Sequence, residues 1–111
     1  MAYDVDLADR IRAVLGPVEG LTEKRMFGGL AFLVNGHMAV SASGRGGLLL
    51  RVDPAQTESL IAPPQVDRFV MRGREMDGWL RVDPEAVATR ATLRRWVQFG
   101  VKYARSLPPK S

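Results

Sequence analysis

Few side chains in this sequence have the chemistry of catalysts or metal ligands, and they do not cluster. The chain has one histidine, His37, and no cysteine. A metal site needs several such donors at close spacing, so none is expected, and cysteine nucleophiles are excluded. Ser41 and Ser43 lie near His37, but neither stands in a Gly-x-Ser-x-Gly motif. We therefore predict no catalytic residue, no metal and no cofactor.

Two other features have only a superficial likeness to active sites. The run Gly44-Arg45-Gly46-Gly47 joins two predicted strands and opens no helix, so it lacks the helix N-terminus on which phosphate loops depend. Glu75 and Asp77 flank a predicted turn, where we expect them to stay solvated. The sequence thus favours a protein that is not an enzyme. A small enzyme or ligand-binding protein with an unrecognised pocket is the third hypothesis.

Basic residues gather toward the C-terminus. Through Asp67 there are six Lys/Arg and eight Asp/Glu, whereas from Arg68 onward there are ten and four, and no acidic residue follows Glu85. Such asymmetry attracts polyanions. A solvated helix face opposite a core stripe is the competing interpretation, and it is favoured. The candidate contacts to nucleic acid are Arg72, Arg74, Arg94, Arg95, Lys102 and Arg105.

A predicted hairpin positions the rest of the chain. Asn35-Gly36 separates two apolar runs, and both residue types accept the positive φ of a type I′ turn. That turn pairs Val34 with His37, Leu33 with Met38 and Phe32 with Ala39. Two adjacent glycines, Gly28-Gly29, predict a kink in the first strand of this hairpin, with a bulge or a close backbone approach there.

The remaining periodicity predicts an α+β protein. We expect a helix ending at Gly16-Pro17, and strands over 22–34, 37–42 and 48–52. A short helix over 54–62, strands over 65–71 and 79–82, and a long helix over 84–107 follow. The prediction is one domain spanning residues 1–111. It is a two-layer α+β fold with an antiparallel five-stranded sheet and helices on one face, in the order α-β(3)-α-β(2)-α.

One local pattern occurs twice. Leu50-Arg51-Val52-Asp53-Pro54 returns as Leu80-Arg81-Val82-Asp83-Pro84. Each copy predicts a strand that runs into an Asp N-cap and a proline at the first helical position.

The hairpin also predicts a partner. Leu30, Phe32 and Val34 share one face of the sheet, and three helices can cover only that face well. The opposite face is apolar too, and an exposed apolar patch usually marks an interface. We therefore expect a homodimer. Its candidate interface consists of Ala31, Leu33, Met38 and Val40.

The expected location is the cytoplasm. The acidic N-terminus has no basic-then-apolar signal pattern. No apolar run reaches the roughly 18 residues of a membrane span, so no membrane association is expected.

The sequence resembles the N-terminal domain of the TfoX/Sxy family of bacterial regulators, which are linked to competence genes. The motifs that carry the resemblance run in order along most of the chain. Their marker residues are Met26, Phe27, Gly28, Gly29, Asn35, Gly36, Gly78, Trp79 and Trp96.

The resemblance implies a fold of the order α-β(3)-α-β(2)-α, similar to secretion chaperones, and it brings no catalytic residue to map. Full-length members add a C-terminal domain. The first hypothesis is a non-enzymatic protein-interaction domain, a homodimer that acts as a regulatory adaptor or transcriptional co-regulator with a regulatory protein partner. The alternative is direct nucleic-acid binding through the basic C-terminal helix.

Overall fold

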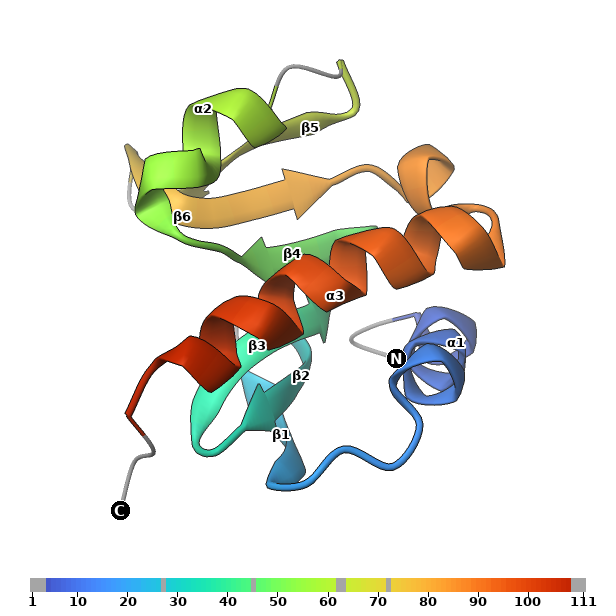
Figure 1. Cartoon of the computed structure of the whole chain (residues 1–111). Helices are drawn as coiled ribbons and strands as arrows, with labels where there is room; N and C mark the ends of the chain where they lie inside the picture. Colours follow the sequence, from blue (N-terminus) through green and yellow to red (C-terminus); the bar gives the residue numbers. More distant parts are fainter. Residues whose placement is uncertain (1–3, 27, 45, 62–63, 72, 109–111) are drawn as a thin grey trace.

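A single antiparallel sheet with helices on one face forms the molecule (Figure 1). The computed structural model describes residues 4–26, 28–44, 46–61, 64–71 and 73–108. The strands lie in the order β1-β2-β3-β4-β6-β5. Their bounds are Leu21–Met26 (β1), Gly29–Val34 (β2), His37–Ala42 (β3), Leu48–Arg51 (β4), Val66–Met71 (β5) and Arg74–Val82 (β6). The predicted α+β class is confirmed, with six strands in place of five.

The sixth strand arises at the paired glycines. Gly28 has a φ of +73° and lies in a turn, so β1 folds back on β2, with Met26 opposite Gly29. The predicted bulge within one long strand is therefore wrong, because the glycine provides a reversal of the chain. Phe27, the residue before this turn, lies outside the described residues.

The β2–β3 hairpin begins in the predicted register and then departs from it. Asn35 and Gly36 have φ values of 54° and 85°, and the pairs Val34–His37 and Leu33–Met38 are confirmed. Beyond them the register shifts, and Phe32 lies opposite Val40 instead of Ala39. The extra residue is a bulge that sends the following side chains to the other face.

Three helices pack on one face of the sheet. These are α1 (Val5–Leu15), α2 (Thr57–Leu60) and α3 (Arg90–Ser106). Asp4 caps α1 by accepting a hydrogen bond from the Leu7 amide, and Thr89 caps α3 by accepting one from the Thr92 amide. The last helix therefore starts later than predicted, because Pro84–Val87 forms a separate 3₁₀ turn, η2.

The repeated pattern forms two neighbouring strands. β4 and β6 pair antiparallel, with Leu50 opposite Leu80. Each strand runs into a short 3₁₀ turn that starts with proline, as predicted; the first is η1 (Pro54–Gln56). Asp53 accepts a hydrogen bond from the Ala55 amide, whereas Asp83 accepts one from Arg81, so only the first copy is a side-chain N-cap.

The backbone of α3 lies directly on the sheet at Gly100. A Cβ atom built on this glycine would overlap the carbonyl oxygen of Ala39, the extra residue of the β3 bulge, and would lie 2.8 Å from Cδ1 of Leu50. No larger residue fits there without displacing backbone. The contact fixes which face of α3 is buried, and that face carries Leu93, Trp96, Val97 and Ala104.

Two arginines hold α1 in place. Arg10 donates hydrogen bonds to the carbonyl oxygens of Val87 and Ala88, 2.6 and 3.0 Å away, just before α3 begins. Arg12 binds both carboxylate oxygens of Glu23 on β1, at 2.8 and 2.7 Å. Because one arginine reaches the η2–α3 junction and the other the edge strand, the orientation of α1 is fixed at both sides.

We expect Gly100→Ala to lower the free energy of unfolding by about 1–2 kcal/mol in urea denaturation. The overlap with the Ala39 carbonyl outweighs the better helix propensity of alanine. Gln98→Ala, an exposed position on the same helix, serves as the control and should change stability by less than about 0.5 kcal/mol. A Gly100→Ala protein as stable as the wild type would contradict the close packing.

The Arg12–Glu23 pair should make stability depend on pH. The hydrogen bond from Arg12 lowers the pKa of the Glu23 carboxyl. The stabilisation that the Glu23 carboxylate gives the folded state is therefore complete above its unfolded-state pKa, about 4.3. This stabilisation is lost as the pH falls through the lower folded-state pKa.

We expect Glu23→Gln to lower the free energy of unfolding at pH 7 by about 0.2–1 kcal/mol. The effect is small because the side chains of Arg12 and Glu23 are both more than a third exposed. The difference from wild type should shrink on acidification, as measured by thermal unfolding across pH. Glu19→Gln is the control. If the stability difference between Glu23→Gln and wild type persists in strong acid, the Arg12–Glu23 ion pair is not its cause.

Candidate interaction surfaces

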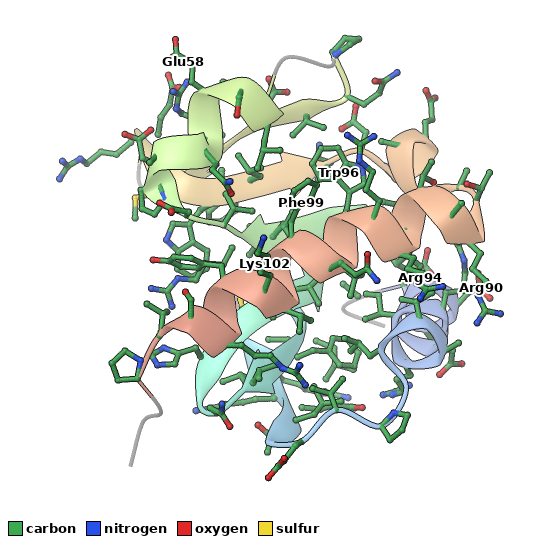
Figure 2. The ribbon with its side chains drawn as sticks, in the orientation of Figure 1. Glu58, Arg90, Arg94, Trp96, Phe99 and Lys102 are labelled. Carbon is green, nitrogen blue, oxygen red and sulfur yellow. The ribbon has the colours of Figure 1, made fainter. Side chains whose placement is uncertain are left out.

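A groove runs between α1 and α3, with a volume of about 590 Å³. Helix α1 lies beside α3 (Figure 2). The apolar side chains of the groove come from both helices and from the loop after α1. They are Val14, Leu15, Val18, Val97 and Val101, and the polar ones are Arg94, Gln98, Lys102 and Arg105. The groove therefore combines an aliphatic floor with a basic side.

The three basic residues of the groove follow one line along α3. Arg94, Lys102 and Arg105 stand at helical spacing, all are exposed, and we call them the basic row. Among the described residues none of the three has an ion-pair partner. Because salt bridges do not neutralise them, their positive charge faces the groove and the solvent.

Two carboxylates beside α1 pair with an arginine of that helix. Asp9 on α1 and Glu23 on β1 both bind Arg12, at 2.6 and 2.7 Å. The hydrogen bond with Glu23 is also the main reason that the pKa of Arg12 is raised. These carboxylates therefore balance an arginine of α1 and leave the charge of α3 in place.

The structure separates the six predicted nucleic-acid contacts. Arg94, Lys102 and Arg105 share the groove, and Arg95 lies in an adjoining hollow that Arg94 and Gln98 also line. Arg74 is exposed at the start of β6, in the β5–β6 hairpin. Arg72 lies outside the described residues. The predicted contacts thus do not form one continuous site.

The sheet face away from the helices carries a second, small apolar cluster. Ala31, Met38 and Leu49 are buried in it even without a covering layer. Around them pack the half-buried side chains of Met26, Leu33, Phe69 and Trp79. This face is less open than the alternation predicted, since larger side chains at its rim cover the smaller ones.

Val40 does not belong to the candidate interface. The β3 bulge places its side chain, with that of Phe32, in the main core under the helices, where it has no exposed surface. Of the four predicted interface residues, Ala31, Leu33 and Met38 share the uncovered face. The prediction for Val40 is wrong, because sequence alternation gives no sign of an inserted residue.

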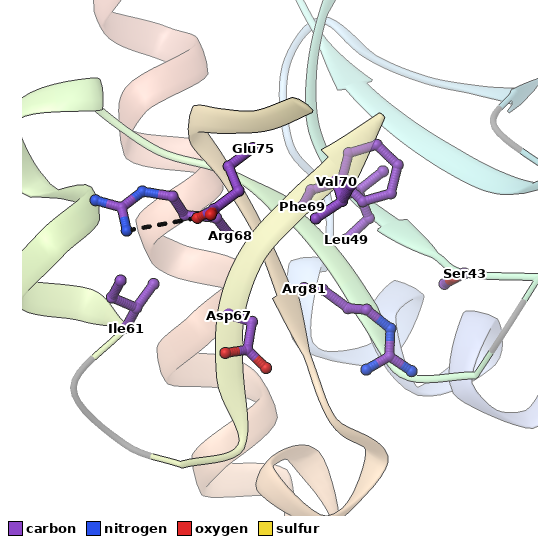
Figure 3. A pocket seen from close by; sticks show the side chains of 9 residues that line it. All are labelled: Ser43, Leu49, Ile61, Asp67, Arg68, Phe69, Val70, Glu75 and Arg81. Carbon is purple, nitrogen blue, oxygen red and sulfur yellow. Dashed lines mark ion pairs between the residues drawn. The ribbon is translucent and has the colours of Figure 1, made fainter. Parts of the chain in front are cut away.

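A hollow of about 530 Å³ follows the free edge of β5 (Figure 3). Its charged lining includes Arg68, Glu75 and Arg81. Arg68 binds Asp77 at 2.8 Å and lies 4.0 Å from Glu75, and the Asp77 hydrogen bond raises its pKa. Glu75 and Asp77 remain largely exposed, as expected, and both pair with Arg68 from within β6. These contacts balance charge and do not create a reactive group.

The predicted motif residues near this edge have structural contacts. The Arg51 guanidinium lies 5.2 Å from the ring centre of Trp79 and 5.6 Å from that of Tyr103. The Trp79 ring thus faces an arginine of β4. Gly78, with a φ of +84°, donates its amide to the Thr57 hydroxyl at 2.7 Å.

His37 has a structural partner as well. Its Nε2 lies 2.6 Å from the carbonyl oxygen of Pro108, so the imidazole holds the segment after α3 against the start of β3. Within the described residues no group of three or more His, Cys, Asp or Glu side chains is arranged to hold a metal ion. In the same part of the chain, no helix is long and apolar enough to cross a membrane.

The contribution of α1 to the groove does not follow from the sequence. Leu7, Ile11, Val14 and Leu15 recur at helical spacing, which predicts that this apolar stripe packs on the sheet. Leu7 and Ile11 do so, whereas Val14 and Leu15 remain half-buried beside α3. The one sequence feature that points to the groove is the width of the apolar stripe on α1, which exceeds what packing on the sheet alone requires.

Comparison with known proteins places the chain in a family. The TfoX N-terminal domain model matches residues 13–104, which is most of the chain. No curated protein and no solved structure matches the chain. The matched segment includes all six strands and nearly all of α3. The chain therefore belongs to the TfoX N-terminal domain family.

Proposed function

We propose that this protein is a non-catalytic regulatory adaptor that acts by binding a partner protein at the α1–α3 groove. The family is associated with competence regulation, which supports a regulatory role. The observation that carries the proposal is the basic row, three exposed cations without salt-bridge partners among the described residues, beside an aliphatic floor. Surfaces that combine unpaired charge with apolar area are typical of binding sites.

The groove supports a protein partner more strongly than nucleic acid. Phosphate contacts need cations and hydrogen-bond donors but gain little from valine and leucine side chains. The half-buried Val14, Leu15 and Val101 would stay in water beneath a phosphate backbone. A protein segment with apolar side chains removes that area from water.

We expect Arg94→Glu with Lys102→Glu to lose the partner protein in affinity capture from native lysate, followed by mass spectrometry. Reversing two charges of the basic row turns attraction into repulsion. Lys24→Glu with Arg74→Glu is the matched control: it changes net charge equally, but both residues are exposed on strands away from the groove. Capture of the same proteins by wild type and both double variants would contradict the proposal.

Direct nucleic-acid binding is the second candidate, and the same basic row supports it. This candidate requires an affinity for duplex or single-stranded DNA that falls steeply with salt, since bound cations release counterions from phosphate. Fluorescence anisotropy at low salt measures it. Tight, salt-sensitive DNA binding that is lost in the groove variant would favour this candidate over a protein partner.

A homodimer through the uncovered sheet face stays a prediction. We expect Leu33→Glu to shift the protein toward monomer in size-exclusion chromatography with light scattering, because a charge would be buried among apolar rim side chains. Gln98→Glu, an exposed position on α3 on the other side of the sheet, is the control. A wild-type protein that is monomeric at high concentration would show that this face does not pair.

A further inference from the structure

We propose that the α1–α3 groove binds an acidic amphipathic helix of the partner protein; this inference rests on the proposed function and specifies its ligand. The occupant's apolar stripe packs on the aliphatic floor, and its carboxylates face the basic row. The groove is lined on both sides by helices, and a third helix adds a layer of the kind these helices already form with each other.

The dimensions of the site suit a short helix. Arg94 to Arg105 spans about 17 Å along the axis of α3, roughly three helical turns. Apolar positions of an amphipathic helix recur every three or four residues, so about three of them would face the floor. The half-buried side chains of Val14, Leu15 and Val101 lie in that floor.

Charge complementarity selects an acidic occupant over a basic or neutral one. Arg94, Lys102 and Arg105 share the same side of the groove and find no carboxylate partner among the described residues. Gln98 lies between Arg94 and Lys102 on this line, and its side-chain amide can donate a hydrogen bond to an acceptor or accept one from a donor of the bound helix. An acidic helix therefore provides the counter-charges that the fold lacks here.

The test uses a synthetic helical peptide of about 15 residues, with a leucine stripe flanked by glutamates. Fluorescence anisotropy measures its binding to the full chain. We expect Arg94→Glu with Lys102→Glu to weaken binding roughly tenfold or more. The off-groove pair Lys24→Glu with Arg74→Glu should stay within about twofold of wild type.

A second set of variants tests the aliphatic floor. We expect Val14→Ser with Val101→Ser to weaken the peptide roughly tenfold, since apolar contact area is lost. Circular dichroism checks that this variant folds. An independent readout uses a polarity-sensitive dye attached to the cysteine of Gln98→Cys. The dye labels only this position because the natural chain has no cysteine. Its signal should change with the peptide, whereas the same dye at Ser59→Cys on α2 should not respond.

The outcomes separate this inference from the proposed function. If the off-groove pair weakens the peptide as much as the groove pair, or the dye at position 98 stays silent, the helix-docking inference is overturned. The same holds if a lysine-flanked peptide binds equally well, or if only DNA binds. The adaptor proposal survives these results when lysate capture still depends on the basic row, and it fails when that dependence is missing.

Discussion

The close approach of α3 to the sheet at Gly100 is the constraint on which the other surfaces depend. A helix backbone that touches the carbonyl of Ala39 can present only one side inward, and Leu93, Trp96, Val97 and Ala104 supply it. The basic row is then outward by necessity. The bulge at this crossing also determines which β3 side chains belong to the main core, and it places Val40 beneath the helix. One contact thus decides the exposed face of α3 and the composition of both sheet faces.

The second organising feature is the local pairing of charge. Arg12 takes Asp9 and Glu23, Arg68 takes Asp77 and Glu75, and Arg81 takes Asp83. These pairs lie within or beside the strands and α1, where they balance Arg12, Arg68 and Arg81. The exposed cations of α3 remain, because no acidic residue follows Glu85 in the sequence. Three of these cations, Arg94, Lys102 and Arg105, line the groove.

A regulatory binding role fits this division between a rigid scaffold and an adjustable outer surface. The helix–sheet contact, the turn glycines and the Arg10 hydrogen bonds to the η2–α3 junction keep the groove walls in fixed positions. The exposed side chains of α3 do not take part in these contacts. Their types can therefore vary to suit a partner with little loss of folding stability. The uncovered sheet face differs, since its apolar side chains already cover one another.

The sequence by itself determined the α+β class, the Asn35-Gly36 turn, the first two pairs of its register and the basic character of the last helix. All of these rest on local propensity, short-range pairing or charge, which neighbouring residues specify. It also carried the family motifs. The sixth strand, the Ala39 bulge and the place of Val40 were decided by tertiary structure, because a glycine pair suits either a kink or a reversal, and an inserted residue changes no alternation pattern. The groove was decided there too. Its two sides come from α1 and α3, which meet only when both pack on the same sheet, so their shared surface has no signature in either segment alone.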